Sequence, residues 1–188
     1  MEKIDNLVVI NGSPRPDNIS NTYRALMAET EFLKEKNPNM NINYFKLPAD
    51  LRGCQNCKKC FLECNIKDNF QEIAEAIEYA DVVMLGSPVY LDMPTPQMVA
   101  FLTRLNCKAE NTNREFFRDK KAYLVATSFC SGTKTVLHTM MGACEMLGFT
   151  IEGRSTREYI TLWQDDKLRG GMTRADAIYV KKIGTKHV

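Results

Sequence analysis

Four of the seven cysteines in this 188-residue chain lie within eleven residues, at Cys54, Cys57, Cys60 and Cys64. Their spacing of two, two and three intervening residues allows four thiolates to converge on one compact centre, as a [4Fe-4S] cluster requires. Thiolates also bind Zn²⁺, although structural zinc sites usually join two cysteine pairs through a longer gap. A third interpretation is that these are free or redox-active thiols. The run therefore predicts sulfur chemistry and leaves the three alternatives open.

A polar loop follows an apolar run near the N-terminus and forms a second candidate site. Leu7–Ile10 is typical of a strand buried on both faces, and the chain then enters the segment Gly12–Thr22, which is rich in hydroxyl and amide side chains. Backbone N–H groups, a helix dipole and short polar side chains can together bind a phosphate dianion. The segment lacks the lysine pattern of a P-loop. The alternative is an ordinary loop in which Ser20 caps the next helix.

Apolar segments alternate between strand and helix patterns along most of the chain. Strands are predicted at 7–10, 42–47, 81–86, 122–126 and 150–154, and helices at 20–36, 69–79, 98–105 and 135–147, with a further short helix within 170–183. Asp68 and Gln71 resemble a capping box at the start of the second helix. Such alternation predicts right-handed βαβ crossovers and a doubly wound, five-stranded parallel sheet with helices on both faces, in the flavodoxin-like order. We expect one domain over 1–188, with a cysteine-rich loop at 50–67 and a C-terminal extension from about 156.

Two loops that share the residues Gly-Ser-Pro carry a resemblance to a known family. Gly12-Ser13-Pro14-Arg15 precedes Asn21-Thr22, and Gly86-Ser87-Pro88-Val89-Tyr90 precedes Phe101-Leu102-Thr103-Arg104. Over roughly residues 4 to 155 the chain resembles the NADPH-dependent FMN reductase and iron-sulfur flavoprotein group of the flavodoxin-like superfamily. The resemblance implies noncovalent FMN, with its phosphate near Ser13, Arg15, Ser20, Asn21 and Thr22 and its isoalloxazine along Pro88, Val89 and Tyr90. The loop after the fourth strand adds Thr127, Ser128 and Gly132 as expected flavin contacts.

The same resemblance implies an FMN-dependent oxidoreductase that receives electrons from NAD(P)H and forms a homodimer. The expected acceptor is a small molecule or, if the cysteines hold a [4Fe-4S] cluster, a ferredoxin-like electron carrier. No catalytic side chain is expected, because hydride can pass directly between the nicotinamide and the flavin. Two other functions remain open: a noncatalytic FMN electron carrier, and a thiolate metal-binding module without flavin. The net charge of +2 disfavours the first, since such carriers are typically acidic.

Composition excludes several other classes of function. A net charge of +2 gives no overall field for nucleic acid or an anionic membrane, and neither is expected as a partner. No apolar run approaches the ~20 residues of a membrane span, and no secretory signal is recognisable. We therefore expect a soluble, cytoplasmic protein with reduced thiols. Only two histidines are present, so we expect His138 to lie on a helix surface and His187 in the C-terminal tail.

Overall fold

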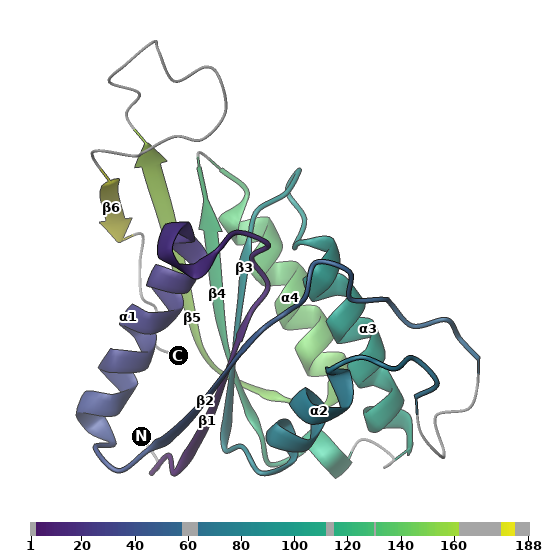
Figure 1. The fold of residues 1–188 in the computed structure, drawn as a ribbon. Helices are drawn as coiled ribbons and strands as arrows, with labels where there is room; N and C mark the ends of the chain where they lie inside the picture. Colours follow the sequence, from purple (N-terminus) through teal and green to yellow (C-terminus); the bar gives the residue numbers. More distant parts are fainter. Residues whose placement is uncertain (1–2, 58–63, 112–114, 130, 162–177, 183–188) are drawn as a thin grey trace.

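A six-stranded sheet forms the centre of the computed structural model (Figure 1). The structure describes residues 3–57, 64–111, 115–129, 131–161 and 178–182. No helix among these residues is long and apolar enough to cross a membrane.

The sheet has the strand order β2-β1-β3-β4-β5-β6. Its strands are β1 (Asn6–Asn11), β2 (Asn41–Lys46), β3 (Val82–Pro88), β4 (Lys121–Ser128), β5 (Thr150–Thr161) and β6 (Ile178–Lys182). The first five strands pair in parallel, which confirms the predicted flavodoxin-like order. β6 is an antiparallel edge strand, so the helix predicted within 170–183 is wrong at 178–182. β5 continues past its expected end at residue 154 and offers a ladder to the β-branched and aromatic run Ile178-Tyr179-Val180.

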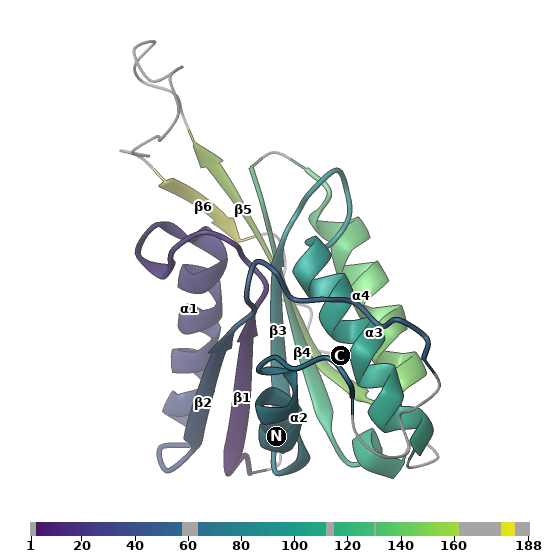
Figure 2. The ribbon, with the colours of Figure 1, turned by 45° about the vertical axis from the view of Figure 1, so that its right-hand side comes forward.

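Helices cover both faces of the sheet, as predicted. They are α1 (Asn21–Lys36), α2 (Phe70–Glu78), α3 (Pro96–Asn111) and α4 (Thr133–Leu147), with short 3₁₀ turns η1 (Asp17–Ile19) and η2 (Glu115–Phe117). α1 lies on one face, and α2, α3 and α4 lie on the other (Figures 1 and 2). Parallel strands covered on both faces are nearly continuous apolar runs, because successive side chains point to opposite sides.

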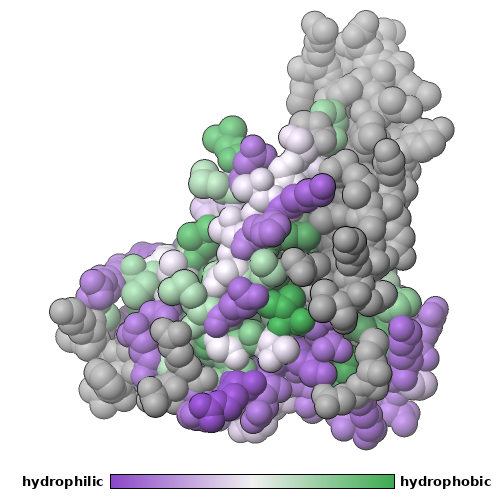
Figure 3. All heavy atoms as spheres, turned by 180° about the vertical axis from the view of Figure 1, so that it is seen from behind, coloured by the Kyte–Doolittle hydropathy of each residue, from purple (hydrophilic) through white to green (hydrophobic). Residues whose placement is uncertain are grey.

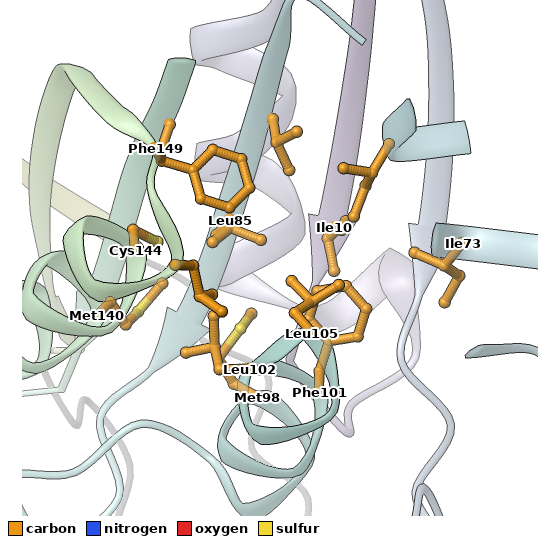
Figure 4. Close-up of a cluster of buried hydrophobic side chains, with 14 of the residues drawn as sticks. Ile10, Ile73, Leu85, Met98, Phe101, Leu102, Leu105, Met140, Cys144 and Phe149 are labelled. Carbon is orange, nitrogen blue, oxygen red and sulfur yellow. The ribbon is translucent and has the colours of Figure 1, made fainter. Parts of the chain in front are cut away.

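Alternate residues of β1 and β3 belong to two separate cores. Leu7 and Val9 pack with Leu26 beneath α1, whereas Val8 and Ile10 face the other three helices. Figure 4 shows the second core, in which side chains of α2, α3 and α4 and of the residue before β5 meet those of β1 and β3: Ile10, Ile73, Leu85, Met98, Phe101, Leu102, Leu105, Met140, Cys144 and Phe149. This packing holds α3 rigidly beside the loops that follow β1 and β3.

The start of α2 differs from the predicted capping box. The N-cap is Asn69, whose side chain makes no capping hydrogen bond, while Asp68 Oδ1 accepts a bond of 3.1 Å from Phe70 N. The amide of Gln71 donates to Glu75 Oε1 instead of reaching back. The second carboxylate oxygen of Asp68 forms an ion pair with Arg104 of α3. This tertiary contact takes the place of a reciprocal capping box with Gln71.

Candidate functional site

The loops that follow β1, β3 and β4 meet at the carboxyl edge of the sheet, as predicted for a doubly wound fold. Gly12 N donates to Gly86 O over 2.8 Å, and Val89 N donates to Thr127 O over 2.8 Å. The hydroxyls of Thr22 and Thr127 are 2.7 Å apart, and both side chains are buried. Residues from three loops are thereby brought together.

Two glycines allow the close approach of these loops. A Cβ on Gly12 would lie 2.9 Å from Met98 Cε, and one on Gly86 would lie 2.7 Å from Leu26 Cδ1. Neither position has room for a side chain without displacing a core residue. The glycine of each Gly-Ser-Pro loop therefore allows a strand, a helix and a loop to pack closely together.

The first loop supplies two buried hydroxyls and one exposed guanidinium. Ser13 N donates to Asn11 Oδ1 over 2.9 Å, and Arg15 N donates to Ser13 Oγ over 3.3 Å. Ser20 is the N-cap of α1, the role that the alternative interpretation gave it, with Oγ accepting from Tyr23 N at 3.1 Å. Both serine oxygens act as acceptors here, so each hydroxyl proton can still be donated to a ligand. The Arg15 side chain is exposed and able to reach an anion.

The first turn of α1 offers backbone donors beside these hydroxyls. A helix leaves the N–H groups of its first turn without intrahelical acceptors. Ser20 Oγ serves the N–H of Tyr23, which leaves those of Asn21 and Thr22 for an acceptor outside the helix. The helix dipole favours an anion at this position. The five predicted phosphate-site residues therefore lie on one short stretch of loop and helix: Ser13, Arg15, Ser20, Asn21 and Thr22.

A polar network that the sequence did not reveal anchors this loop to β2. Tyr44 OH donates to Asp17 Oδ2 over 2.9 Å and accepts from Asn11 Nδ2 over 3.0 Å. Lys46 Nζ lies 3.2 Å from Asp17 Oδ1 and also bonds to the carbonyl of Arg15. Burial raises the pKa of the Tyr44 phenol, which keeps its proton for the bond to Asp17. Asp17 is therefore tied to β2 through Tyr44 and Lys46, and the same lysine binds the backbone carbonyl of Arg15.

Thr95 connects the first and second loops, and sequence reasoning also missed it. Its Oγ1 donates to Gly12 O over 2.8 Å and accepts from Met98 N over 3.3 Å, while its N donates to Ser87 Oγ over 3.0 Å. A threonine directly before Pro96 at the start of α3 matches a common helix-start pattern. This pattern is the signal in the sequence that could have identified Thr95.

Replacing Thr95 by valine should lower the free energy of unfolding by about 1 to 3 kcal/mol, because the Gly12 carbonyl and the Met98 amide lose a buried partner. Denaturant unfolding measures the change. Thr139→Val is the matched control, because Thr139 is exposed on α4 and its hydroxyl bonds to Thr135 O. Equal stability of the two variants would show that Thr95 does not connect the loops.

The segment after β3 forms an exposed turn next to the predicted isoalloxazine site. Tyr90 and Met93 exchange backbone hydrogen bonds of 2.9 and 3.0 Å. Leu91 and Asp92 have φ angles of 51° and 59°, a backbone conformation uncommon for residues other than glycine. The side chains of Leu91 and Met93 are 93% and 58% exposed. Figure 3 shows a face of the molecule on which hydrophobic and hydrophilic residues are interspersed. Exposed apolar side chains of this turn therefore lie next to the predicted isoalloxazine site.

The predicted third-loop residues lie partly on the sheet. Thr127 and Ser128 are the last residues of β4, not loop residues, because they pair with Arg157 and Glu158 of the extended β5. Gly132 is the N-cap of α4 with φ +87°.

Asp92 brings the loop after β3 into contact with the loop after β4. A Cβ on Gly132 would meet Asp92 Oδ1 at 2.1 Å, so the turn after Tyr90 packs directly on this glycine. Gly132 therefore belongs to the contact between two loops, at the same edge as the other candidate residues.

The hydroxyl of Ser128 is buried at this edge and has no hydrogen-bond partner among the described residues. Buried polar groups in native proteins almost always have a partner, supplied by protein, water or ligand. Ser128 therefore fits a site for a ligand with polar atoms. With the free donors of α1, it makes the residues present compatible with FMN.

The cysteine run is only partly described by the structure. Cys54 and Cys57 are exposed and Cys64 is half-buried, and none of these three forms a disulfide. Cys60 lies outside the described residues. Among the residues that the structure describes, no three histidine, cysteine or acidic side chains are gathered closely enough to hold a metal ion. The donor type fits an iron-sulfur cluster, whereas the described thiols are not assembled into one site.

The remaining cysteine and histidine positions offer no further chemistry. Cys144 is buried on α4, and burial raises the pKa of its thiol to about 12, so it packs as a small apolar group. Cys107 is half-buried on α3. His138 is exposed on α4, as predicted. Cys130 and His187 lie outside the described residues.

Comparison with known proteins decides the family. Residues 6–156 match the NADPH-dependent FMN reductase family. The chain belongs to this family. It is therefore a member of a family of FMN-binding oxidoreductases, as the two Gly-Ser-Pro loops predicted.

Proteins named iron-sulfur flavoproteins are among its relatives. One from Methanocaldococcus jannaschii is 32% identical over 104 residues, which cover 53% of this chain and 49% of that protein. One from Clostridioides difficile is 32% identical over 108 residues, covering 55% and 47% respectively. The chain thus spans about half the length of the curated relatives it matches.

Solved structures confirm the fold alone. An apo NADH:FMN oxidoreductase superimposes with a TM-score of 0.61 at 17% identity, covering 82% of this chain and 75% of that one. An azoreductase from Bacillus anthracis gives a TM-score of 0.60 at 13% identity, covering 82% and 86%.

Proposed function

We propose that this member of the FMN reductase family binds FMN at the carboxyl edge of its sheet and oxidises NAD(P)H. The observation that carries the proposal is the convergence of three loops there, next to the Ser128 hydroxyl, which has no hydrogen-bond partner within the part of the chain that the structure describes. When bound, FMN supplies the chemistry of accepting a hydride and releasing electrons. The protein's task is to bind, orient and partly enclose the reactants.

The phosphate end of the site is the N-terminus of α1. The guanidinium of Arg15 supplies charge, and the hydroxyls of Ser13 and Ser20 can donate while their oxygens remain bonded to the loop. Lys46 binds both the Asp17 carboxylate and the Arg15 carbonyl, so this side of the loop is held to β2. The donors are thus fixed before the ligand arrives, which lowers the entropic cost of binding.

The ring end of the site is the segment Pro88–Tyr90. Val89 N is bonded to Thr127 O, so this stretch is held beside the end of β4. Tyr90 is 43% exposed and offers an aromatic surface at the rim. Direct hydride transfer needs no side-chain acid or base, and among the described residues at this edge no histidine is present.

The cysteine run adds a second proposed centre. Its 2, 2, 3 spacing and the relatives named iron-sulfur flavoproteins support a [4Fe-4S] cluster on Cys54, Cys57, Cys60 and Cys64. Such a centre would pass single electrons to a ferredoxin-like carrier, whereas without it the acceptor would be a small molecule. A homodimer is proposed as well, with the exposed Leu91, Met93 and Phe129 near the partner subunit.

Anaerobic purification followed by visible spectroscopy and steady-state kinetics tests the function. We expect a flavin spectrum and turnover of NADH or NADPH with a quinone or a dye as acceptor. An FMN-loaded protein that is reduced by one electron but does not oxidise NAD(P)H would be a noncatalytic carrier. Failure to bind FMN at micromolar concentration would contradict the proposal altogether.

A further inference from the structure

The edge strand β2 carries a tyrosine and a lysine beside the loop that follows β1. Tyr44 and Lys46 are two residues apart, so their side chains lie on the same face of the sheet. This is the face that carries α1, because Ile42 and Tyr44 pack against the core beneath that helix. Figure 2 shows β2 next to β1, and the register pairs Lys46 with Asn11, the last residue of β1. Both side chains therefore lie where the chain enters the proposed phosphate site.

Hydrogen bonds join these two residues to Asn11 and Asp17. Asn11 is fully buried, and its Nδ2 donates to Tyr44 OH over 3.0 Å and to Asp17 Oδ1 over 3.3 Å. Tyr44 OH donates to Asp17 Oδ2 over 2.9 Å, and Lys46 Nζ lies 3.2 Å from Asp17 Oδ1. Both carboxylate oxygens of Asp17 are thus bound. We call these four residues the β2 anchor.

Two members of the β2 anchor bind the main chain at residues of the proposed phosphate site. Ser13 N donates to Asn11 Oδ1 over 2.9 Å. Lys46 Nζ donates to the carbonyl oxygen of Arg15. These bonds use neither the hydroxyl of Ser13 nor the guanidinium of Arg15. Both side-chain donors are therefore held in place by their backbone.

Asp17 links the β2 anchor to the start of α1. Ser20 N donates to the carbonyl oxygen of Asp17 over 3.3 Å, at the end of the turn η1. Ser20 Oγ in turn accepts from Tyr23 N, and the Tyr23 ring packs edge-on against Tyr44 with centroids 5.5 Å apart. The first turn of α1 is therefore tied to the same strand as the loop.

We propose that Tyr44 and Asp17 are positioning residues for the phosphate of FMN, and this inference rests on the proposed FMN site. The hydrogen bond between them fixes the loop on β2, and the loop then presents Ser13, Arg15 and Ser20 in one arrangement. A loop that is ordered before binding loses less conformational freedom when the ligand binds. Two residues that do not themselves bind the phosphate thus contribute to its affinity.

Asp17→Asn separates positioning from charge, because the two effects have opposite signs. A carboxylate near a phosphate dianion repels it, so through charge alone the substitution would tighten FMN binding. Asparagine keeps the size of the side chain but replaces one acceptor oxygen by an NH₂ group. Either the Tyr44 hydroxyl or the Lys46 ammonium then loses its acceptor. We expect FMN to bind about fivefold more weakly despite the smaller repulsion.

Tyr44→Phe tests the same bond without a change of charge. Phenylalanine keeps the ring that packs against Tyr23 and removes the hydroxyl between Asn11 and Asp17. We expect FMN to bind about tenfold more weakly. Riboflavin has the same ring system but no phosphate, so its affinity should change by less than about twofold. Quenching of flavin fluorescence on titration with protein gives both dissociation constants.

A double-mutant cycle measures the same effect independently. In a chain with Ser13→Ala and Arg15→Ala, the loop has lost two of the donors that Tyr44 is proposed to position. Adding Tyr44→Phe to this chain should weaken FMN binding further by less than about twofold.

Tyr123→Phe is the matched control. It also removes a hydroxyl that donates to a carboxylate, over 2.8 Å to Glu29 Oε2, and Tyr123 lies in the core beneath α1. Denaturant unfolding should show that this variant and Tyr44→Phe are both less stable than the wild type. Only Tyr44→Phe should change the ratio of FMN affinity to riboflavin affinity.

The outcomes distinguish this inference from the proposed function. Wild-type protein that binds no FMN at micromolar concentration would overturn both. If the wild type binds FMN, any of three results would overturn the positioning role alone: tighter binding by Asp17→Asn, equal losses of FMN and riboflavin affinity in Tyr44→Phe, or an undiminished effect of Tyr44→Phe in the cycle.

Discussion

A chain in which Ser13 and Arg15 are both replaced by alanine should bind FMN at least about 30-fold more weakly than the wild type. The change removes a buried hydroxyl donor and an exposed guanidinium, each worth roughly 1 kcal/mol or more to a bound phosphate. It also removes the acceptor of the Arg15 N–H, so the loop loses part of its shape. Quenching of FMN fluorescence on titration with protein gives the dissociation constant.

Arg118→Ala is the charge-matched control for this experiment. Arg118 is 67% exposed, pairs with Glu115 and lies before β4, at the opposite edge of the sheet. It should leave FMN affinity unchanged. The double variant should unfold near the wild-type denaturant concentration, because the cores beneath α1 and α3 are untouched. Undiminished affinity in the double variant would show that the phosphate binds elsewhere.

Serine in place of Cys57 should abolish most of the iron and sulfide in anaerobically purified protein while leaving FMN bound. A cubane needs a soft ligand at each corner, and a serine hydroxyl at neutral pH is a poor substitute for thiolate. Cys60→Ser should behave in the same way. Iron, acid-labile sulfide and FMN are measured on one sample, so that loss of the cluster is distinguished from loss of the protein.

Cys144→Ala is the matched control, since it also removes one sulfur but from the core beneath α4. The other interpretations of the cysteine run predict different results. Free thiols would leave metal content at zero in every variant, including the wild type. Stoichiometric zinc in the wild type, lost with Cys57→Ser, would assign the segment a structural role.

The fold was largely predictable from local patterns. Leu7–Ile10 and Val82–Leu85 are apolar at every position, and only a strand buried on both faces explains such runs. Because helical patterns separate these runs, a parallel sheet with crossovers on both faces follows. The added strand β6 was missed, because the tail itself contains no signal that β5 extends to Thr161 and can pair with it.

The candidate flavin site was predictable in outline and not in its contacts. Loops after parallel strands meet at one edge, so the sequence pattern alone predicts that Ser13, Pro88 and Ser128 lie near each other. Asp17 and Tyr44 were not identified as partners, since their bond depends on the register that sets β2 beside β1. Thr95 was missed because its bond to Gly12 O joins residues 83 positions apart.

The class of sheet and the loops that could hold a ligand were therefore predictable from the sequence, which left the cysteine run with three interpretations. These features follow from hydrophobic periodicity and residue spacing, which are local properties of a chain. The contacts of Arg104 with Cys64 and Asp68, and the bond of Gln71 to Glu75 that replaces the reciprocal half of the capping box, depend on tertiary packing. A buried guanidinium takes the partners that packing brings within reach, and packing depends on how helices and strands far apart in the chain are set against one another.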